Sequence, residues 1–175
     1  PYMVDAGINA IPANHSDLDE WRKNFVGVSY VHSATNFEFF GAIDDLWLGE
    51  DGEYLVVDYK ATAKKDEVNL DADWQISYKR QMEIYQWLLR KNGLPISNRG
   101  WFVYCNGKRD LNRFDNKVEF RVSLLPYDGN DDWVETALIE AKETLNRDDL
   151  PPPDENCDFC TYREETAIFE RGSDG

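Results

Sequence analysis

The sequence has few cysteines, no long hydrophobic run and no basic leader. Its three cysteines are an odd number, which argues against a framework of disulfides in a chain without a signal peptide. No hydrophobic run approaches the roughly 18 residues of a membrane-spanning helix. Residues 1–5 (PYMVD) contain neither the basic nor the hydrophobic stretch that begins a signal peptide. These absences predict a cytoplasmic protein that does not contact a membrane, and the abrupt start predicts a truncated N-terminus.

Basic residues are also scarce. The 175 residues include 19 Lys and Arg against 34 Asp and Glu, for a net charge of -15. Proteins that bind nucleic acid usually carry a basic surface, so this balance is unfavourable for such a partner. The acids concentrate at 66–73, 128–132 and 148–155. Two explanations fit this distribution. There could be a local basic surface on an otherwise acidic protein, or an acidic surface adapted to a saline habitat.

Hydrophobic periodicity and turn residues divide the chain into helices and strands. The expected elements, in order, are a helix at 16–23, strands at 25–34, 37–48 and 54–61, a helix at 73–92, strands at 100–105 and 117–125, and a helix at 131–146. This order predicts an α/β fold with a central mixed β-sheet flanked by helices. A hydrophobic content of 42% is enough for one core, so residues 1–175 are expected to form a single domain with a C-terminal tail at 151–175.

Hydrophobic periodicity also predicts which side chains lie in the core. On the two longer helices these are Trp74, Tyr78, Met82, Tyr85, Leu88, Leu89, Trp133, Ala137, Leu138 or Ile139, and Leu145. In the strand at 117–125, four alternate residues are expected to be half-buried: Val118, Phe120, Val122 and Leu124.

Two acids and a lysine form the strongest chemical pattern. Asp58 and Lys60 are two residues apart in a strand, so their side chains lie on the same face. A Gly-Asp-Gly turn predicts a hairpin that brings Asp44, on the preceding strand, close to Asp58. Two carboxylates and a backbone carbonyl, that of Tyr59, are the hard oxygen ligands that Mg²⁺ and Mn²⁺ prefer. A lysine beside such an ion suits the hydrolysis of a phosphodiester bond.

Other interpretations of these acids remain open. Paired acids on neighbouring strands can form a solvated face, and Asp58 with Lys60 can form a structural ion pair. The hydrophobic run at 55–57 favours burial of both, and buried charges usually pair or bind a metal. Asp45 lies on the opposite face from Asp44 and is interpreted as structural or solvated.

Three motifs together resemble the signature of the RecB-like PD-(D/E)XK nucleases. They are G-x-I-D at 41–44, D-x-K at 58–60 and Q-x-x-x-Y at 81–85, and the resemblance extends from about residue 25 to the tail. It implies a restriction-endonuclease-like core and catalytic roles for Asp44, Asp58, Lys60, Gln81 and Tyr85. Gln81 and Tyr85 share a helical face, and the resemblance implies that this face looks toward the metal. Alternatively, Tyr85 is a core residue and Gln81 its polar edge.

The resemblance implies a metal-dependent DNA nuclease, expected to be an exonuclease or flap nuclease that acts on single-stranded ends in DNA repair, recombination or CRISPR- or phage-related processing. The chain lacks a phosphate-binding G-x-x-x-x-G-K-[ST] loop, so a helicase or recombination protein would be a separate partner. Four basic residues are predicted near the site: Lys64, Lys65, Lys79 and Arg80. They either contact the phosphate backbone of DNA or are ordinary solvated charges. A catalytically inactive module that binds a protein partner is the alternative.

The chain departs from the family at histidine and cysteine. Relatives commonly use a histidine of an N-terminal helix as a metal ligand, and neither His15 nor His32 is expected to take that role. Some relatives, including CRISPR-associated adaptation nucleases and AddAB-type nuclease domains, hold an iron–sulfur cluster with four cysteines. Cys157 and Cys160 resemble part of that set, but Cys105 is expected in the core, so no cluster is expected. A further interpretation is that Cys157 and Cys160 form half of a zinc site that is completed by a second copy of the chain in a dimer.

Overall fold

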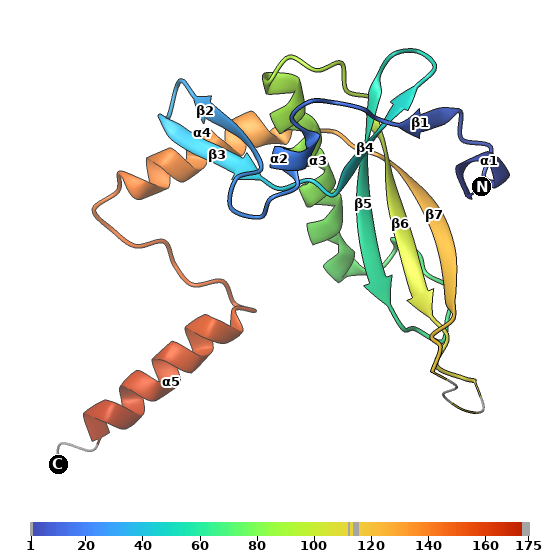
Figure 1. Ribbon diagram of the computed structural model, residues 1–175. Coiled ribbons are helices and arrows are strands. Elements are labelled where there is room, and N and C mark those ends of the chain that lie inside the picture. Colours follow the sequence, from blue (N-terminus) through green and yellow to red (C-terminus); the bar gives the residue numbers. More distant parts are fainter. Residues whose placement is uncertain (1, 112, 114–115, 173–175) are drawn as a thin grey trace. The chain divides into compact units, whose positions relative to one another are not determined.

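The computed structural model describes residues 2–111, 113 and 116–172, with side chains up to residue 168. Parts of the expected loop at 106–116 and of the tail at 151–175 therefore lie outside the described residues. The chain divides into two compact units, Pro1–Leu138 and Ile139–Gly175. In chain order the elements are α1 (Tyr2–Asp5), β1 (Ala10–Pro12), α2 (Leu18–Trp21), β2 (Val28–His32), β3 (Phe37–Gly41), β4 (Asp45–Gly49), β5 (Tyr54–Thr62), η1 (Asp73–Gln75), α3 (Ile76–Lys91), β6 (Arg99–Gly107), β7 (Phe120–Asp128), α4 (Trp133–Leu145) and α5 (Asp158–Gly172) (Figure 1).

The first unit is built around a five-stranded mixed sheet in the order β1-β4-β5-β6-β7. Strands β5 and β6 are parallel, and the other neighbours are antiparallel. Parallel neighbours need a crossover, and α3 supplies it between β5 and β6. The prediction of an α/β fold with a central mixed sheet is confirmed.

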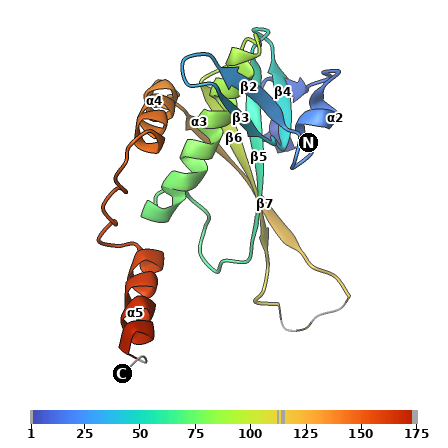
Figure 2. The ribbon, with the colours of Figure 1, turned by 90° about the vertical axis from the view of Figure 1, so that its left-hand side faces the viewer.

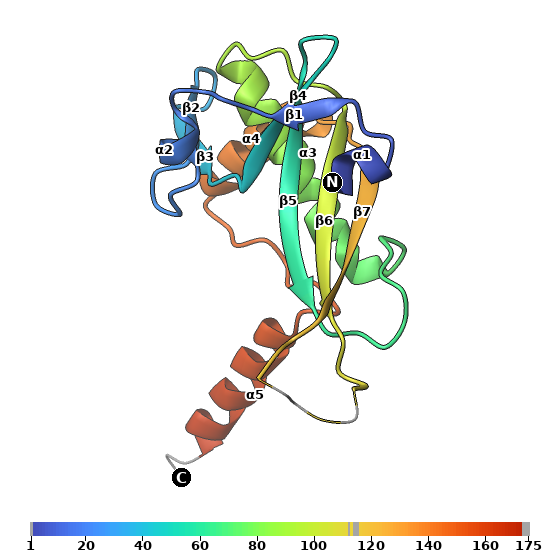
Figure 3. The same ribbon diagram turned by 45° about the vertical axis from the view of Figure 1, so that its right-hand side comes forward.

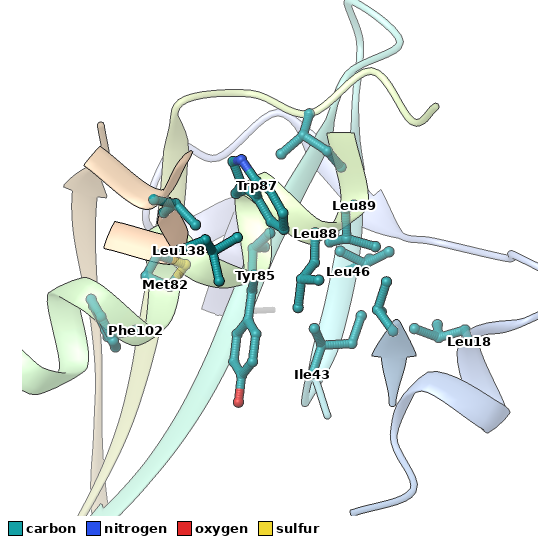
Figure 4. Close-up of a cluster of buried hydrophobic side chains, with 14 of the residues drawn as sticks. Leu18, Ile43, Leu46, Met82, Tyr85, Trp87, Leu88, Leu89, Phe102 and Leu138 are labelled. Atoms are coloured by element: carbon teal, nitrogen blue, oxygen red, sulfur yellow. The ribbon is translucent and has the colours of Figure 1, made fainter. Parts of the chain in front are cut away.

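Helix α3 covers one face of this sheet (Figure 2). Its buried side chains pack with those of β4, β5 and β6 into the larger hydrophobic cluster, which includes Leu46, Val56, Met82, Leu88 and Phe102 (Figure 4). The opposite face carries a smaller cluster of Trp47, Val57 and Val103, against which Met3 and Ile8 of the N-terminal segment pack. Figure 3 shows α1 on that side, in front of β6 and β7, with α3 behind them.

The expected single strand at 37–48 is wrong. It is split into β3, which pairs with β2 in a separate two-stranded sheet, and β4, which pairs with β1 and β5. Between them, the Ile43 N–H donates to the Trp21 carbonyl (3.1 Å) and Arg22 donates to the Asp44 carbonyl (2.9 Å). The end of α2 thus takes the hydrogen bonds that would have continued the strand.

Several expected core positions are also wrong. Trp74 is 53% exposed and Leu145 of α4 is exposed, whereas of the alternatives Leu138 and Ile139 it is Leu138 that is buried. Val118 lies before the start of β7, and Phe120 pairs with Gly107 at the end of β6. Neither Val118 nor Phe120 is among the residues of the two hydrophobic clusters. Periodicity selects a helical face or a strand face but does not show how far along it the covering element extends. Helices α1 and α5 and strand β1 were not anticipated.

Candidate active site

Strand β5 places Asp58 and Lys60 on the face that α3 covers. Asp58 is only 2% exposed. The Lys60 ammonium donates to its Oδ1 at 2.9 Å and lies 2.7 Å from its Oδ2. The run of hydrophobic residues before Asp58 holds this part of the strand in the core, since Val56 and Val57 are fully buried. A charged pair is therefore held in a largely nonpolar environment.

Asp44 lies beside this pair, although it is not on a strand as expected. It sits in the 42–44 segment, directly before β4. Its Oδ2 accepts a hydrogen bond of 2.8 Å from the backbone N–H of Tyr59, the residue between Asp58 and Lys60. Arg22 fixes the segment from the other side by donating to the Asp44 carbonyl. The exposed Asp44 carboxylate is thereby held at the middle of β5.

Gln81 and Tyr85 of α3 complete a chain of polar contacts. Lys60 donates to Gln81 Oε1 (3.1 Å), and Gln81 Nε2 donates to the Tyr85 hydroxyl (2.8 Å). The Tyr85 ring is buried, and its hydroxyl points away from the surrounding hydrophobic side chains (Figure 4). A Cβ on Gly41 would lie 2.8 Å from the Tyr85 ring, so the glycine of the G-x-I-D motif leaves room for this tyrosine.

The buried Asp58 carboxylate has the Lys60 ammonium as its partner among the described residues. Burial raises the pKa of Asp58 above its ordinary value; the Lys60 contact lowers it and the Asp44 charge raises it further. Asp58 Oδ2 is buried, and the partner that the described residues give it is the Lys60 ammonium at 2.7 Å. One ammonium leaves further lone pairs of this desolvated carboxylate open to a ligand, and a hard divalent cation is a ligand that fits.

The donor set around that oxygen is small. Among the described residues, no group of three or more His, Cys, Asp and Glu side chains is placed to hold a metal. The site offers two carboxylates, which suits an ion that keeps several waters and takes further oxygens from a phosphate. Asp44 and Asp58 therefore fit Mg²⁺ or Mn²⁺ better than a closed zinc site, which needs four ligands.

Tyr59 and Asp45 face the other side of β5. The Tyr59 hydroxyl donates to Asp45 Oδ2 (2.8 Å), while Asp45 Oδ1 accepts from Arg22 (2.6 Å) and from the Leu46 N–H (2.8 Å). Burial, followed by the Asp45 hydrogen bond, raises the pKa of Tyr59 to about 12. Asp45 thus holds the segment before β4 against β5, in line with its structural interpretation, and only the backbone of Tyr59 belongs to the site.

Two tyrosines next to Lys60 were not predicted as part of the site. The Tyr78 ring centre is 4.4 Å from the Lys60 ammonium, a cation–π contact. Tyr104 pairs with Lys60 in the β5–β6 register, and burial raises the pKa of its hydroxyl, with smaller contributions from Tyr78 and Asp58. Tyr78 had been assigned to the core alone, although it precedes Gln81 by three residues on the same helical face.

The histidines and cysteines are held in other surroundings. His15 stacks on Trp21 at 4.5 Å, and buried His32 hydrogen-bonds Thr35 (2.9 Å) and Glu135 (2.7 Å). Cys105 is half-buried on β6. Cys157 and Cys160 belong to the second unit, where the Cys160 N–H donates to Cys157 Sγ at 3.2 Å near the start of α5.

Comparisons with known proteins give one match. The model of the PD-(D/E)XK nuclease superfamily matches residues 8–164, which include every element from β1 to the start of α5. Neither the curated proteins nor the solved structures gave a match. Among the described residues, no helix combines the length and the hydrophobicity that crossing a membrane requires.

Proposed function

We propose, from the premise that this chain belongs to the PD-(D/E)XK nuclease superfamily, that it is a metal-dependent nuclease that hydrolyses phosphodiester bonds in DNA. The observation that carries the proposal is the buried Asp58 carboxylate, which is ion-paired with Lys60 and held beside Asp44. A sheet face that served only structure would gain by replacing this buried ion pair with hydrophobic side chains.

Each side chain of the site has a distinct role in the proposal. Asp44, Asp58 and the backbone carbonyl of Tyr59 would hold Mg²⁺ or Mn²⁺, which when bound polarises a phosphate and lowers the pKa of water. Lys60 orients the attacking water and stabilises negative charge on the phosphate in the transition state. Gln81 holds the Lys60 ammonium, and Tyr85 holds the Gln81 amide, so the ammonium keeps one position.

The finer assignment is to the RecB-like branch and to exonuclease or flap cleavage of single-stranded ends in repair, recombination or CRISPR- or phage-related processing. Its support is the conjunction of the D-x-K and Q-x-x-x-Y motifs, which the structure joins through the Lys60–Gln81 hydrogen bond. A helicase or recombination protein would supply unwinding, because the sequence contains no phosphate-binding loop.

A second candidate is a nuclease-fold module that binds a protein and does not cleave. The net charge of -15 favours it, because phosphate is repelled by an acidic surface. The buried Asp58 weighs against it, because keeping this desolvated charge brings no benefit to a surface used only for binding.

Cleavage assays separate the two candidates. Labelled single- and double-stranded DNA would be incubated with the protein in Mn²⁺ or in EDTA. We expect cleavage in Mn²⁺ that disappears in EDTA and in Asp58→Ala, and we expect Lys60→Ala to cleave about 10²- to 10³-fold more slowly. Absence of cleavage on every DNA would favour the binding module, and cleavage by Asp58→Ala would refute the site assignment.

Metal binding has a readout that does not need cleavage. Mn²⁺ at about 100 times its dissociation constant should stabilise the folded protein by about 2.7 kcal/mol, which thermal unfolding detects. We expect Lys60→Ala to keep this stabilisation and Asp58→Ala to lose it. Equal stabilisation of Asp58→Ala and the wild type would place the ion elsewhere.

A further inference from the structure

Five cations gather around one pocket of about 310 Å³ in the first unit. Its lining residues are Lys64, Lys65, Asn106, Gly107, Lys108, Arg109, Asp110 and Arg121. The pocket thus collects five of the chain's 19 basic residues and a single acid, on a protein that has 34 acids. Lys65, Arg109 and Arg121 have no acidic partner in the part of the chain that the structure describes. Crowding unpaired cations is unfavourable, and a polyanion would relieve it.

The pocket lies on the same face of the sheet as the candidate active site. Asn106 is two residues beyond Tyr104, the partner of Lys60, so strand alternation places it on the Lys60 face. The Asn106 side chain fixes the chain after β5, because it accepts from the Lys64 N–H (2.9 Å) and donates to the Lys64 carbonyl (3.1 Å). Arg121 pairs with Asn106 across β6 and β7. The pocket is therefore anchored at the end of the strand that carries Asp58.

Two aromatic rings connect the site with the pocket. The Lys60 ammonium lies 4.4 Å from the centre of the Tyr78 ring, which packs edge-on against Trp74 at 5.4 Å. The Lys64 ammonium lies 4.8 Å from the centre of the Trp74 ring. Trp74 is 53% exposed, so much of its surface is open to a ligand. Cations and rings alternate from the active site to the pocket.

We propose that Trp74 and this basic pocket bind a single strand of nucleic acid, with one base stacked on Trp74 and the phosphates in the pocket. Aromatic rings next to a row of cations bind single strands of nucleic acid. Each base can stack on a ring, and each phosphodiester carries a negative charge that a cation attracts. In a duplex the bases are already stacked on each other, so Trp74 would gain nothing. The direction of the strand toward the metal rests on the proposed function, whereas the binding does not.

The stacking role is tested by binding in EDTA, where no cleavage occurs. Fluorescence anisotropy with a labelled oligo-dT and with a blunt duplex of equal length would measure affinity. We expect Trp74→Ala to bind oligo-dT about 5- to 50-fold more weakly and Trp74→Phe to recover most of the loss. The control is Phe25→Ala, which removes a ring that is 96% exposed outside this path and should leave affinity unchanged.

The cations are tested through the salt dependence of binding. Each phosphate contact contributes about 0.7 to the slope of log affinity against log salt concentration for single strands. The triple variant Lys65→Gln, Arg109→Gln, Arg121→Gln should lower the slope by about 2. A control with the same change of net charge, Lys23→Gln, Arg99→Gln, Arg147→Gln, should leave it within about 0.5 of the wild type.

The outcomes separate this inference from the proposed function. If Trp74→Ala and the pocket variant bind and cleave like the wild type, the inference is overturned and the nuclease proposal stands. If binding depends on both but no DNA is cleaved, the inference stands and the nuclease proposal fails. Equal binding of the duplex, with the same dependence on Trp74, would overturn the single-strand assignment.

Discussion

Two buried carboxylates, one on α3 and one on the sheet face that α3 covers, have different surroundings. Glu83, on the helix itself, is 8% exposed and accepts three hydrogen bonds. The donors are the Tyr127 hydroxyl (2.7 Å), the Asn130 N–H (3.1 Å) and the Trp133 Nε1 (2.7 Å). Asp58, on the facing strand, has the Lys60 ammonium as its partner among the described residues, at 2.9 Å from Oδ1 and 2.7 Å from Oδ2.

The difference distinguishes a structural acid from a candidate catalytic acid. Glu83 ties β7 and the start of α4 to α3, and each of its contacts is directed at a carboxylate oxygen. Burial, together with the Glu83 hydrogen bond, raises the pKa of Tyr127, so this hydroxyl stays a donor at neutral pH. A carboxylate with three hydrogen-bond donors from other elements stabilises a fold, whereas a buried carboxylate with a single ammonium as partner can accept a further ligand.

Among the tests of the contrast between Asp58 and Glu83, Asp58→Asn should have the largest effect. This change keeps the shape of the side chain and removes its charge, so cleavage should fall by at least about 10³-fold. Stability should stay within about 1 kcal/mol of the wild type, because the amide oxygen of the variant can still accept from Lys60, whose ammonium also donates to Gln81 and lies over the Tyr78 ring. Cleavage rates and urea unfolding measure the two quantities. A loss of several kcal/mol without loss of cleavage would make Asp58 a structural residue.

Glu83→Ala should lower stability and leave cleavage almost unchanged, the opposite of the result expected for Asp58→Asn. It leaves the Tyr127, Asn130 and Trp133 donors without a partner, which should lower the free energy of unfolding by about 3 kcal/mol. Urea unfolding measures this loss, and cleavage per folded molecule should change little. A Glu83→Ala protein as stable as the wild type would remove the contrast between the two acids.

Gly41→Ala should damage the site through packing alone. The added methyl would lie 2.8 Å from the Tyr85 ring, so the ring must move, at a cost of about 1–3 kcal/mol and with slower cleavage. Thermal unfolding and cleavage rates check both parts. The matched control for packing, measured by thermal unfolding alone because Gly107 lines the basic pocket, is Gly107→Ala, whose nearest contact would be an ordinary 3.5 Å. An equal effect of the two substitutions would contradict a specific role for the space beside Tyr85.

The smallest expected effect concerns Glu135 at the start of α4. Its hydrogen bond with Lys91, and a weaker influence of His32, hold its pKa below the ordinary value of 4.5. A lowered pKa means that the carboxylate stabilises the fold above that value and loses this contribution as pH falls through the folded-state pKa. Because the pair is partly exposed, Glu135→Gln should cost about 0.5–1 kcal/mol at neutral pH. Urea unfolding at several pH values should show the difference vanish in acid; a difference independent of pH would refute it.

The fold class followed from the sequence because α3, α4 and most strands show their own periodicity. The helix expected at 73–92 corresponds to η1 and α3, and the strand expected at 54–61 corresponds to β5. The break at Ala42 and the pairing of β1 with β4 did not follow, because both depend on hydrogen bonds between segments far apart in the chain. The exposure of Trp74 escaped prediction for the same reason, since spacing marks a helical face but not where its cover ends.

Among the site residues, the sequence by itself determined two pairs. Strand alternation put Asp58 and Lys60 on one face, and helical spacing put Gln81 and Tyr85 on another, because both periods are set by local backbone geometry. Only the tertiary structure decided that the two faces meet through the Lys60–Gln81 hydrogen bond and that Asp44 reaches Tyr59 from a loop. Those contacts join separate elements, so their existence depends on how the sheet and α3 pack and not on the spacing within either.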